Sequence, residues 1–187
     1  MADETLAKPR FNPMVWALRL ATIGMLVAGV VVAARKYSTT PEQDELTRFA
    51  TLTVPVYLAD VADAQARFDR VTSPDSHGAD GGTLTPAEAR AMLVDDLMPA
   101  LIRVKKRASL VETSAASVRA SNEEYLAAVD KLIEAGRTAV RAIDDPLLSG
   151  EAGYKQMRQR RREAHEALGA WMMHLRERCE KAGLKIQ

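Results

Sequence analysis

Apolar residues recur at helical spacing along most of the chain. From Pro41 to Val71 they lie mostly three or four residues apart, as on one face of an α-helix. The predicted apolar stripe of this helix consists of Leu46, Phe49, Leu52, Val56, Val61, Ala64 and Phe68. The same period returns from Pro86 to about Val111, from Asn122 to Asp144 and from Glu151 to Ala182. A helix with one apolar stripe is unstable alone in water, so the stripes must pack against one another. The pattern predicts an all-α fold, an antiparallel bundle of about four helices.

Capping sequences mark three of the helix starts. Thr40-Pro41 and Thr85-Pro86 each place an N-cap hydroxyl before a proline at the first helical position. Ser121-Asn122-Glu123-Glu124 is a third capping box, which predicts that the third helix begins at Asn122. For residues 112–120 the sequence is compatible both with a continuation of the helix and with a loop.

Prolines and glycines predict where the helices are disturbed and where they end. Pro55 and Pro99 lie inside the first two stripes, and a proline supplies no N–H to the helix, so we expect kinks there. Asp145-Pro146 ends the third helix, and Gly183 ends the fourth.

The segment from Met14 to Ala34, MVWALRLATIGMLVAGVVVAA, is apolar without a polar face, and Arg19 is its one charged residue. At about 1.5 Å per residue, about 20 residues cross a bilayer core of about 30 Å. We predict an N-terminal tail (residues 1–13), a single-pass transmembrane anchor (14–36) and a helical-bundle domain (37–187). A cleaved signal peptide is the alternative, but acidic residues before the apolar core and Arg35-Lys36 after it favour an uncleaved anchor.

Basic residues are almost equally numerous at the two ends of the apolar segment, with Lys8, Arg10 and Arg19 on the N-terminal side and Arg35, Lys36 and Arg48 on the other. The α-amino group and Arg19 favour a cytoplasmic N-terminus. The bundle is therefore expected outside the cytoplasm, on the periplasmic side of a cell envelope.

The composition agrees with a folded helical protein: 47% of residues are hydrophobic, 27% are charged and 5% are aromatic. A net charge of +1 makes the chain as a whole a poor electrostatic match for nucleic acid. The single cysteine, Cys179, excludes an intrachain disulfide and a Cys-rich zinc site. It lies on the apolar side of its helix, where we expect it to be buried.

No motif in the sequence indicates catalysis, and we expect that the chain is not an enzyme. The loop 77–88 has the length of a calcium-binding loop, but His77, Ala79 and Gly81 occupy positions where oxygen ligands are needed. The Glu-x-x-His spacing of di-metal bundles does not occur. We therefore predict neither a metal nor a cofactor.

Two basic clusters supply the candidate partner-binding residues, one in the second helix and one in the fourth. They are Lys105, Lys106 and Arg107, and Arg158, Arg160, Arg161 and Arg162. If exposed, they would attract an acidic partner, anionic lipid headgroups or nucleic acid, and a peripheral lipid- or nucleic-acid-binding domain is a third interpretation. They can also pair internally, because the first helix is rich in acids and Glu166 follows Arg162 by four residues. We favour internal pairing for most of this charge, with Arg158–Arg162 as the best surface candidate.

These observations favour a membrane-tethered structural or interaction module, a scaffold or accessory protein with coiled-coil-like packing. Its expected partners are membrane lipid and other membrane or envelope proteins; nucleic acid is not expected, and a homo-oligomer is compatible with the pattern. The alternative is a sensory bundle that holds a small ligand or cofactor between its kinked helices, near Pro55, Pro99 and Trp171. The layout resembles the ligand-sensing halves of bacterial membrane receptors, without their second span or signalling domain.

Overall fold

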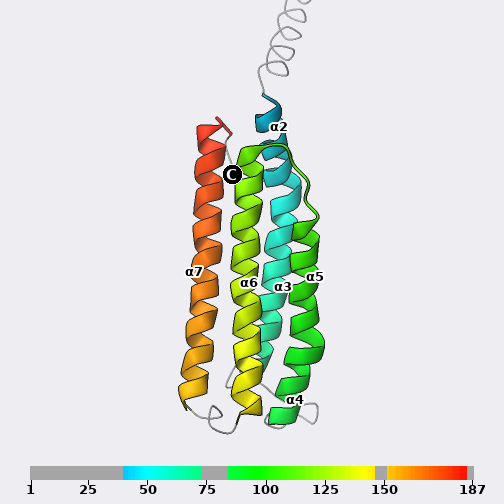
Figure 1. The fold of residues 1–187 in the computed structure, drawn as a ribbon, viewed down its shortest axis with the longest axis vertical. Helices are drawn as coiled ribbons and strands as arrows, with labels where there is room; N and C mark the ends of the chain where they lie inside the picture. The colour runs from blue at the N-terminus through cyan, green and yellow to red at the C-terminus, as the bar shows by residue number, and fades with distance from the viewer. Residues whose placement is uncertain (1–39, 73–83, 146–150, 185–187) are drawn as a thin grey trace, which may run out of the picture. The chain divides into compact units, whose positions relative to one another are not determined.

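The helices of the described residues group into four arms, which run alternately up and down the bundle (Figure 1). The computed structural model describes residues 40–72, 84–145 and 151–184. The first arm comprises α2 (Pro41–Arg48), η1 (Phe49–Thr53) and α3 (Val54–Thr72); the second comprises α4 (Pro86–Ala91), η2 (Met92–Leu97) and α5 (Met98–Ser109). The third and fourth arms are α6 (Ala116–Asp144) and α7 (Glu151–Lys181). Within these ranges the predicted all-α bundle is confirmed.

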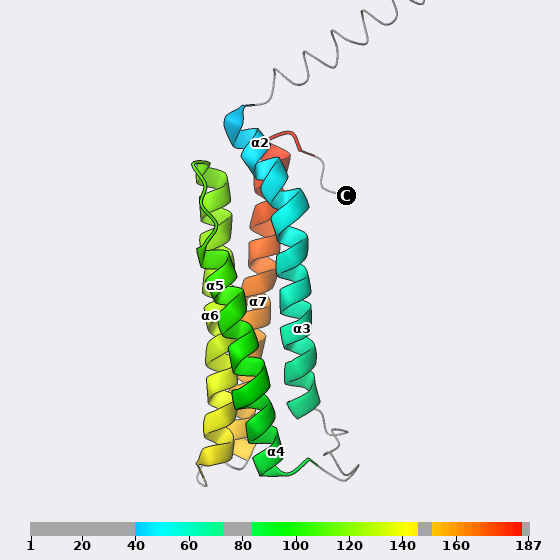
Figure 2. The same ribbon diagram turned by 90° about the vertical axis from the view of Figure 1, so that its right-hand side faces the viewer.

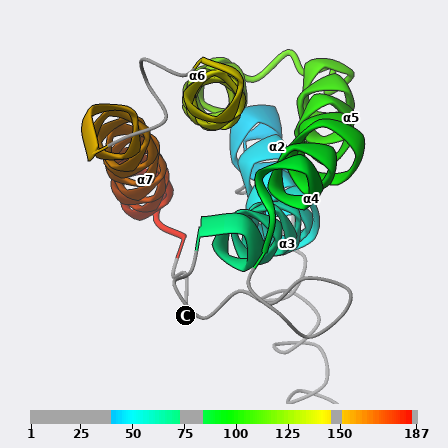
Figure 3. The ribbon, with the colours of Figure 1, turned by 90° about the horizontal axis from the view of Figure 1, so that it is seen from below.

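The second arm ends earlier than its neighbours. α5 ends at Ser109, and the chain continues to Ala116 as an extended connector, residues 110–115 (Figure 2). At this end of the bundle α2 packs directly against α6. Viewed from the opposite end, the arms stand in the order α7, α6, α5 and α3 around a common core (Figure 3).

No helix within the described ranges is long and apolar enough to cross a membrane. The predicted tail, residues 1–13, and the predicted anchor, residues 14–36, lie outside those ranges. The anchor therefore stays a prediction.

A π-helical turn precedes each internal proline. Proline has no N–H, and its ring clashes with the carbonyl four residues earlier. The N–H of Val54 donates instead to the carbonyl of Phe49, five residues back, and Met98 donates to Leu93 in the same way. Each wide turn takes up one extra residue, so both arms continue past their prolines. At Pro55 and Pro99, where the sequence predicts kinks, the structure has π-helical turns just before the prolines.

The extra residue in η1 changes which side chains of the first arm are buried. An unbroken α-helical period places Leu52 and Val56 on the buried side. In the structure Val54 and Tyr57 are buried instead, and Leu52 and Val56 are exposed. This part of the predicted stripe was wrong, because a regular period does not allow for an inserted residue.

Aromatic side chains from three arms form the centre of the core. The rings of Tyr57 and Tyr125 stack with their centroids 3.9 Å apart, and the ring of Trp171 lies 4.9 Å from that of Tyr125. The Tyr57 hydroxyl donates to Asn122 Oδ1 at 2.6 Å, and Asn122 Nδ2 donates to the carbonyl of Ala108 at 2.9 Å. Burial raises the pKa of Tyr57 to about 12 and also raises that of Tyr125, so both phenols remain neutral hydrogen-bond donors.

α6 begins at Ala116, six residues before the start predicted at Asn122. Ser121 and Asn122 are buried inside the helix, so the third predicted capping box was wrong. The Ser121 hydroxyl donates to the carbonyl of Ser117 at 2.9 Å, a bond typical of a helix interior. Asn122 is instead held by its contacts with the first two arms.

Two carboxylates of α2 cap the N-terminus of α6, whose N-cap residue, Ala115, has no side-chain acceptor. Glu45 accepts hydrogen bonds from Ser114 Oγ at 2.6 Å, from the Thr113 hydroxyl and from the Ala115 N–H at 3.1 Å. Glu42 accepts from an N–H in the first turn of α6 at 3.2 Å. A helix N-terminus favours negative charge, and the hydrogen bonds to Ser114, Thr113 and Ala115 lower the pKa of Glu45 to about 2.

The substitution Glu45→Gln is expected to flatten the acid dependence of stability. The folded-state pKa of Glu45 is about 2, below the ordinary 4.5. The ionised carboxylate therefore stabilises the fold above about pH 4.5, and this contribution is lost as the pH falls towards 2. The melting temperature of the wild type should fall more steeply than that of the variant between about pH 5 and about pH 2.

Circular dichroism melts across this range provide the measurement. Glu112→Gln is the control, because it changes an exposed carboxylate of the connector that Glu45 contacts. Its melting temperature should depend on pH as that of the wild type does. If the melting temperature of Glu45→Gln fell with pH as steeply as that of the wild type, the carboxylate cap would not contribute to stability.

Two of the predicted helix signals are confirmed. Thr85 and Glu88 form a complete capping box: the Thr85 N–H donates to the Glu88 carboxylate at 2.9 Å, and the Glu88 N–H donates to Thr85 Oγ1 at 3.2 Å. Gly183 ends α7 with φ +74°, and the Leu184 N–H donates to the carbonyl of Cys179 at 2.8 Å. That bond closes the last turn as a Schellman motif.

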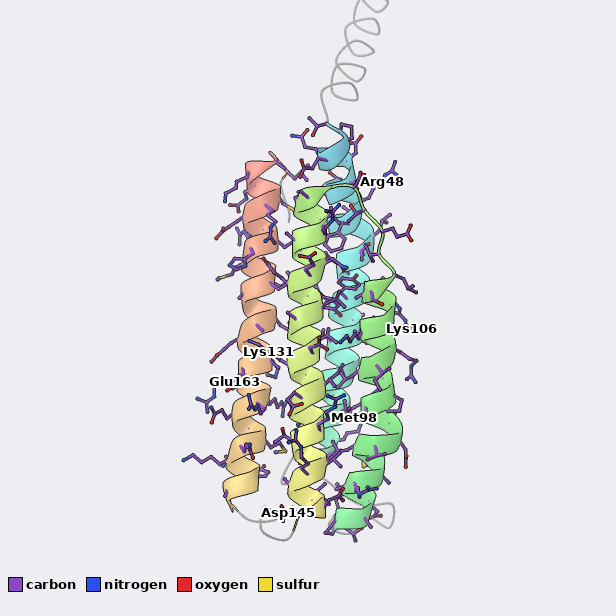
Figure 4. The ribbon with its side chains drawn as sticks, viewed as in Figure 1. Arg48, Met98, Lys106, Lys131, Asp145 and Glu163 are labelled. Carbon is purple, nitrogen blue, oxygen red and sulfur yellow. The ribbon has the colours of Figure 1, made fainter. Side chains whose placement is uncertain are left out.

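Two helical glycines provide a matched test of packing. Gly169 of α7 is exposed, and no described atom lies within 4 Å of a methyl group placed there. A methyl group at Gly136 would come within 2.8 Å of Met98 Sδ, which projects from α5 towards α6 (Figure 4). Gly169→Ala is expected to raise the free energy of unfolding by about 0.5–1 kcal/mol.

Gly136→Ala has the same gain in helix propensity but must displace Met98, and overpacking costs about 1–3 kcal/mol. It should therefore be less stable than Gly169→Ala by about 1 kcal/mol or more in urea denaturation. Adding Met98→Ala to both variants should remove most of this difference in the free energy of unfolding. An equal effect of the two alanines would show that Met98 moves aside at no cost.

Candidate interaction surfaces

The basic cluster of α5 is divided between internal pairing and exposure. Lys105 Nζ lies 2.6 Å from Asp130 Oδ1 of α6, and Arg107 Nη1 lies 2.7 Å from Asp60 Oδ2 of α3. These two ion pairs link α5 to α6 and to α3. Lys106 is exposed on the outer side of α5 and forms no ion pair with any described residue (Figure 4). Arg103, one turn earlier, is likewise exposed.

The basic cluster of α7 is divided in the same way. Arg161 is half-buried between α7 and α3, where it forms an ion pair with Asp69 and lies 5.2 Å from the ring centroid of Phe68. Arg160 pairs with Glu163 at 3.0 Å on its own helix. The structure therefore brings only part of this cluster to a free surface.

Arg158, Arg162 and Tyr154 form what we call the α7 face. They stand at intervals of four residues and so lie on one side of the helix. The Arg158 guanidinium lies 4.6 Å from the ring centroid of Tyr154, whose hydroxyl donates to the carbonyl of Thr72 at 3.1 Å. In the described part of the chain neither arginine forms an ion pair, and Arg162 does not pair with Glu166. The α7 face thus combines the Tyr154 ring, held by its hydrogen bond to Thr72, with the Arg158 guanidinium beside it and that of Arg162 one turn further along the helix.

A second surface lies beside the connector. It is an open groove of about 670 Å³ between α2 and η1 on one side and the connector and the start of α6 on the other. Its apolar lining includes Phe49, Leu52, Val111 and Val118, and Arg48 stands at its edge. The sequence did not predict this groove, although Pro55 marks the arm whose altered register exposes Leu52.

One small cavity lies between the arms in the described part of the chain. The cavity enclosed by α3, η2, α5, α6 and α7, beside Phe68 and His165, has a volume of about 10 Å³. That is about the space of one water molecule. Trp171 itself is buried against the rings of Tyr57 and Tyr125.

Metal-binding and thiol groups can be assessed only for the part of the chain that the structure describes. Among the described residues, no group of three or more His, Cys, Asp or Glu side chains is arranged to hold a metal ion. Glu88, the last residue of the loop 77–88, is held in its capping box; residues 77–83 lie outside the described ranges. Cys179 is buried, and burial raises the pKa of its thiol, which keeps it in the unreactive protonated form.

Comparison with known proteins gives no relative: no family model matches the chain, and neither a curated protein nor a solved structure matches it.

Proposed function

We propose that the protein is a membrane-tethered helical bundle that acts as an interaction module and binds an acidic partner protein through the α7 face. The observation that carries this proposal is the arrangement of Tyr154, Arg158 and Arg162. Tyrosine and arginine are the residue types enriched at the energetic centres of protein interfaces. The other cations of the cluster, Arg160 and Arg161, are already paired with Glu163 and Asp69.

The α7 face is suited to binding because the fold already restricts one of its side chains, and this lowers the conformational entropy that is lost when a partner binds. Arginine side chains lose considerable rotamer freedom when they are fixed in an interface. Stacking on the Tyr154 ring restricts Arg158 before any partner arrives, and the hydrogen bond to Thr72 holds the ring in turn. A guanidinium group then has its planar set of donors available for a carboxylate.

Charge reversal on the α7 face tests this proposal. A photo-crosslinking amino acid at Lys155, one turn before Arg158, should give a discrete adduct with a partner in cells. In the double variant Arg158→Glu/Arg162→Glu, the adduct yield should fall about tenfold, because two attractive contacts become repulsive. Arg103→Glu/Lys106→Glu changes the charge equally on α5 and should leave the adduct unchanged. Equal loss in both double variants would indicate a general effect of net charge and contradict the proposal.

The membrane tether is the second part of the proposal, and the apolar segment from Met14 to Ala34 supports it. We expect the protein to stay with the membrane fraction after alkaline extraction. A cysteine replacing the exposed Met173, in a Cys179→Ala background, should react with a membrane-impermeant maleimide on intact cells. Labelling only after permeabilisation would place the bundle in the cytoplasm.

A ligand-binding bundle is the second candidate function. The observation that favours it is the volume of the groove, about 670 Å³, which falls within the range of small-molecule sites. A small ligand bound there should raise the melting temperature of the wild type and not of Leu52→Asp, since Leu52 lines the groove.

A further inference from the structure

The side of α7 that points away from the other arms carries a regular pattern of charge. α7 packs against α6 and lies at the edge of the bundle, so this side of the helix is exposed (Figure 3). Positions 162, 169 and 176 lie seven residues apart, and positions 166, 173 and 180 each follow one of them by four, which places all six on one side of the helix. These exposed residues, which we call the outer stripe, are Arg162, Glu166, Gly169, Met173, Arg176 and Glu180.

The middle of the outer stripe is open and apolar. The side chain of Met173 is 61% exposed. No described atom lies within 4 Å of a methyl group placed at Gly169, so another side chain can approach the helix backbone closely there. A large exposed apolar side chain thus lies one turn from a position that has room for another.

The four charged residues of the outer stripe are available for contacts with another molecule. Arg162 and Glu166 form no ion pair in the described part of the chain. Arg176 Nε lies 3.0 Å from Glu180 Oε1, but both side chains are more than half exposed. An exposed pair of this kind stabilises a helix little, so its two charges can be exchanged for contacts with a partner.

The order of charges along the outer stripe is complementary to itself when it is reversed. It reads positive, negative, two uncharged positions, positive, negative. Consider a second α7 antiparallel to the first, with the methionine of each outer stripe over the glycine of the other. Positions 162 and 180 are then each seven residues from this central contact, so Arg162 comes opposite Glu180. Positions 166 and 176 are each three residues from it, so Glu166 comes opposite Arg176.

Other pairings of two outer stripes do not match. In a parallel pair each charge meets its own kind, Arg162 beside Arg162 and Glu166 beside Glu166, and like charges in contact are unfavourable. An antiparallel pair shifted by seven residues places Arg162 opposite Met173 and Glu166 opposite Gly169, so neither charge has a partner. The pattern therefore selects one direction and one register.

From this pattern we infer that the partner of the α7 face is a second copy of the chain, bound along the outer stripe through an antiparallel pair of α7 helices. The inference rests on the proposed function, because Arg162 belongs to both surfaces, and it names Glu180 of the second copy as the acidic group. In the same register position 158 lies opposite position 184, just past the end of α7. The Arg158 guanidinium is then near the last carbonyls of the helix, which carry partial negative charge.

Sedimentation velocity of the full-length protein in detergent micelles tests this pairing, because no bilayer then fixes the relative orientation of two copies. We expect the wild type to dimerise as its concentration rises. Arg162→Glu and Glu180→Arg should each raise the dissociation constant at least tenfold, since each places like charges opposite one another at two symmetric positions. Both side chains are exposed, so the variants should retain the helical circular dichroism signal and melting temperature of the wild type.

Mixing the two variants provides the decisive measurement. An equimolar mixture of Arg162→Glu and Glu180→Arg should dimerise at least tenfold more tightly than either variant alone, because the mixed dimer again has opposite charges at both positions. Arg103→Glu and Asp95→Arg are the matched controls. They change the net charge by the same amounts at exposed positions of the second arm, so they should leave the dissociation constant unchanged, alone or mixed.

Two sedimentation results would overturn the inference. One is a wild type that stays monomeric; the other is a mixture that dimerises no better than the single variants. A dimer that neither substitution weakens would be held by another surface and would overturn it as well.

The photo-crosslinked adduct at Lys155 separates this inference from the proposed function. An adduct of about 41 kDa, twice the 20.5 kDa of one chain, would support the second copy as the partner. An adduct of another mass with a monomeric wild type would overturn the inference and leave the proposed function standing, whereas the absence of any adduct would contradict both.

Discussion

Replacing Trp171 with alanine is expected to lower the free energy of unfolding by about 3–5 kcal/mol. Trp171 is 1% exposed, and its ring lies 4.9 Å from that of Tyr125 and 6.3 Å from that of Tyr57. Its removal would leave a cavity bordered by side chains of three arms, and such a cavity collapses only in part. Urea denaturation followed by circular dichroism gives the value.

The indole nitrogen of Trp171 leads to a second prediction, for the substitution Trp171→Phe. Trp171 Nε1 is buried, and no acceptor for it is found among the described residues. Trp171→Phe should therefore cost less than about 2 kcal/mol, because the smaller ring loses contacts but also removes an unsatisfied donor. Met173→Ala, two positions away on the exposed side, should stay within about 0.5 kcal/mol of the wild type. A change of less than about 1 kcal/mol for Trp171→Ala would show that the aromatic centre is not tightly packed.

The arms themselves were predictable because their signals are local. The Thr85 capping box, the apolar period of the second and fourth arms and the glycine at position 183 each depend on residues close together in the chain. The four-arm bundle follows from those signals, since each apolar stripe must be covered. Local rules failed where the chain inserts a residue: the π-turn before Pro55 shifts the buried side from Leu52 to Val54.

The start of α6 shows why a correct local motif can still mislead. The sequence 121–124 has the form of a capping box, but Asn122 is needed as the buried partner of Tyr57, 65 residues away. The carboxylates that do cap α6 come from α2, about 70 residues earlier in the chain. Neither contact has a signal in the neighbouring sequence, because both depend on the arrangement of the arms.

The candidate surfaces were predictable only in part for the same reason. The basic clusters are visible in the sequence, and acids on neighbouring arms were expected to neutralise much of their charge. Which cations are paired depends on the register between arms: Asp69 reaches Arg161 across 92 positions, and Asp60 reaches Arg107 across 47. The groove depends on where α5 ends relative to α6, which the residues between 110 and 120 did not reveal.

The second large effect is expected at Asn122, which joins three arms through its side chain. It accepts from Tyr57 of α3 at 2.6 Å and donates to the carbonyl of Ala108 at the end of α5 at 2.9 Å. Asn122→Ala leaves the buried Tyr57 hydroxyl without this acceptor, and we expect a loss of about 2–3 kcal/mol in urea denaturation. Ser121→Ala, at the adjacent buried position, should cost less than about 1 kcal/mol, because the Ser121 hydroxyl donates within its own helix and Arg178, which donates to Ser121 Oγ at 3.0 Å, keeps its ion pair with Glu124.

A double-mutant cycle separates the hydrogen bond from the packing. Tyr57→Phe alone removes the hydroxyl and leaves Asn122 Oδ1 buried without its donor, at a cost of about 1–2 kcal/mol. In the Asn122→Ala background the same change removes a hydroxyl that has already lost its acceptor, so it should cost nothing or stabilise the protein. The two substitutions should therefore couple by about 1–2 kcal/mol. Strict additivity would mean that the two side chains stabilise the core independently, with Asn122 acting through its bond to α5 alone.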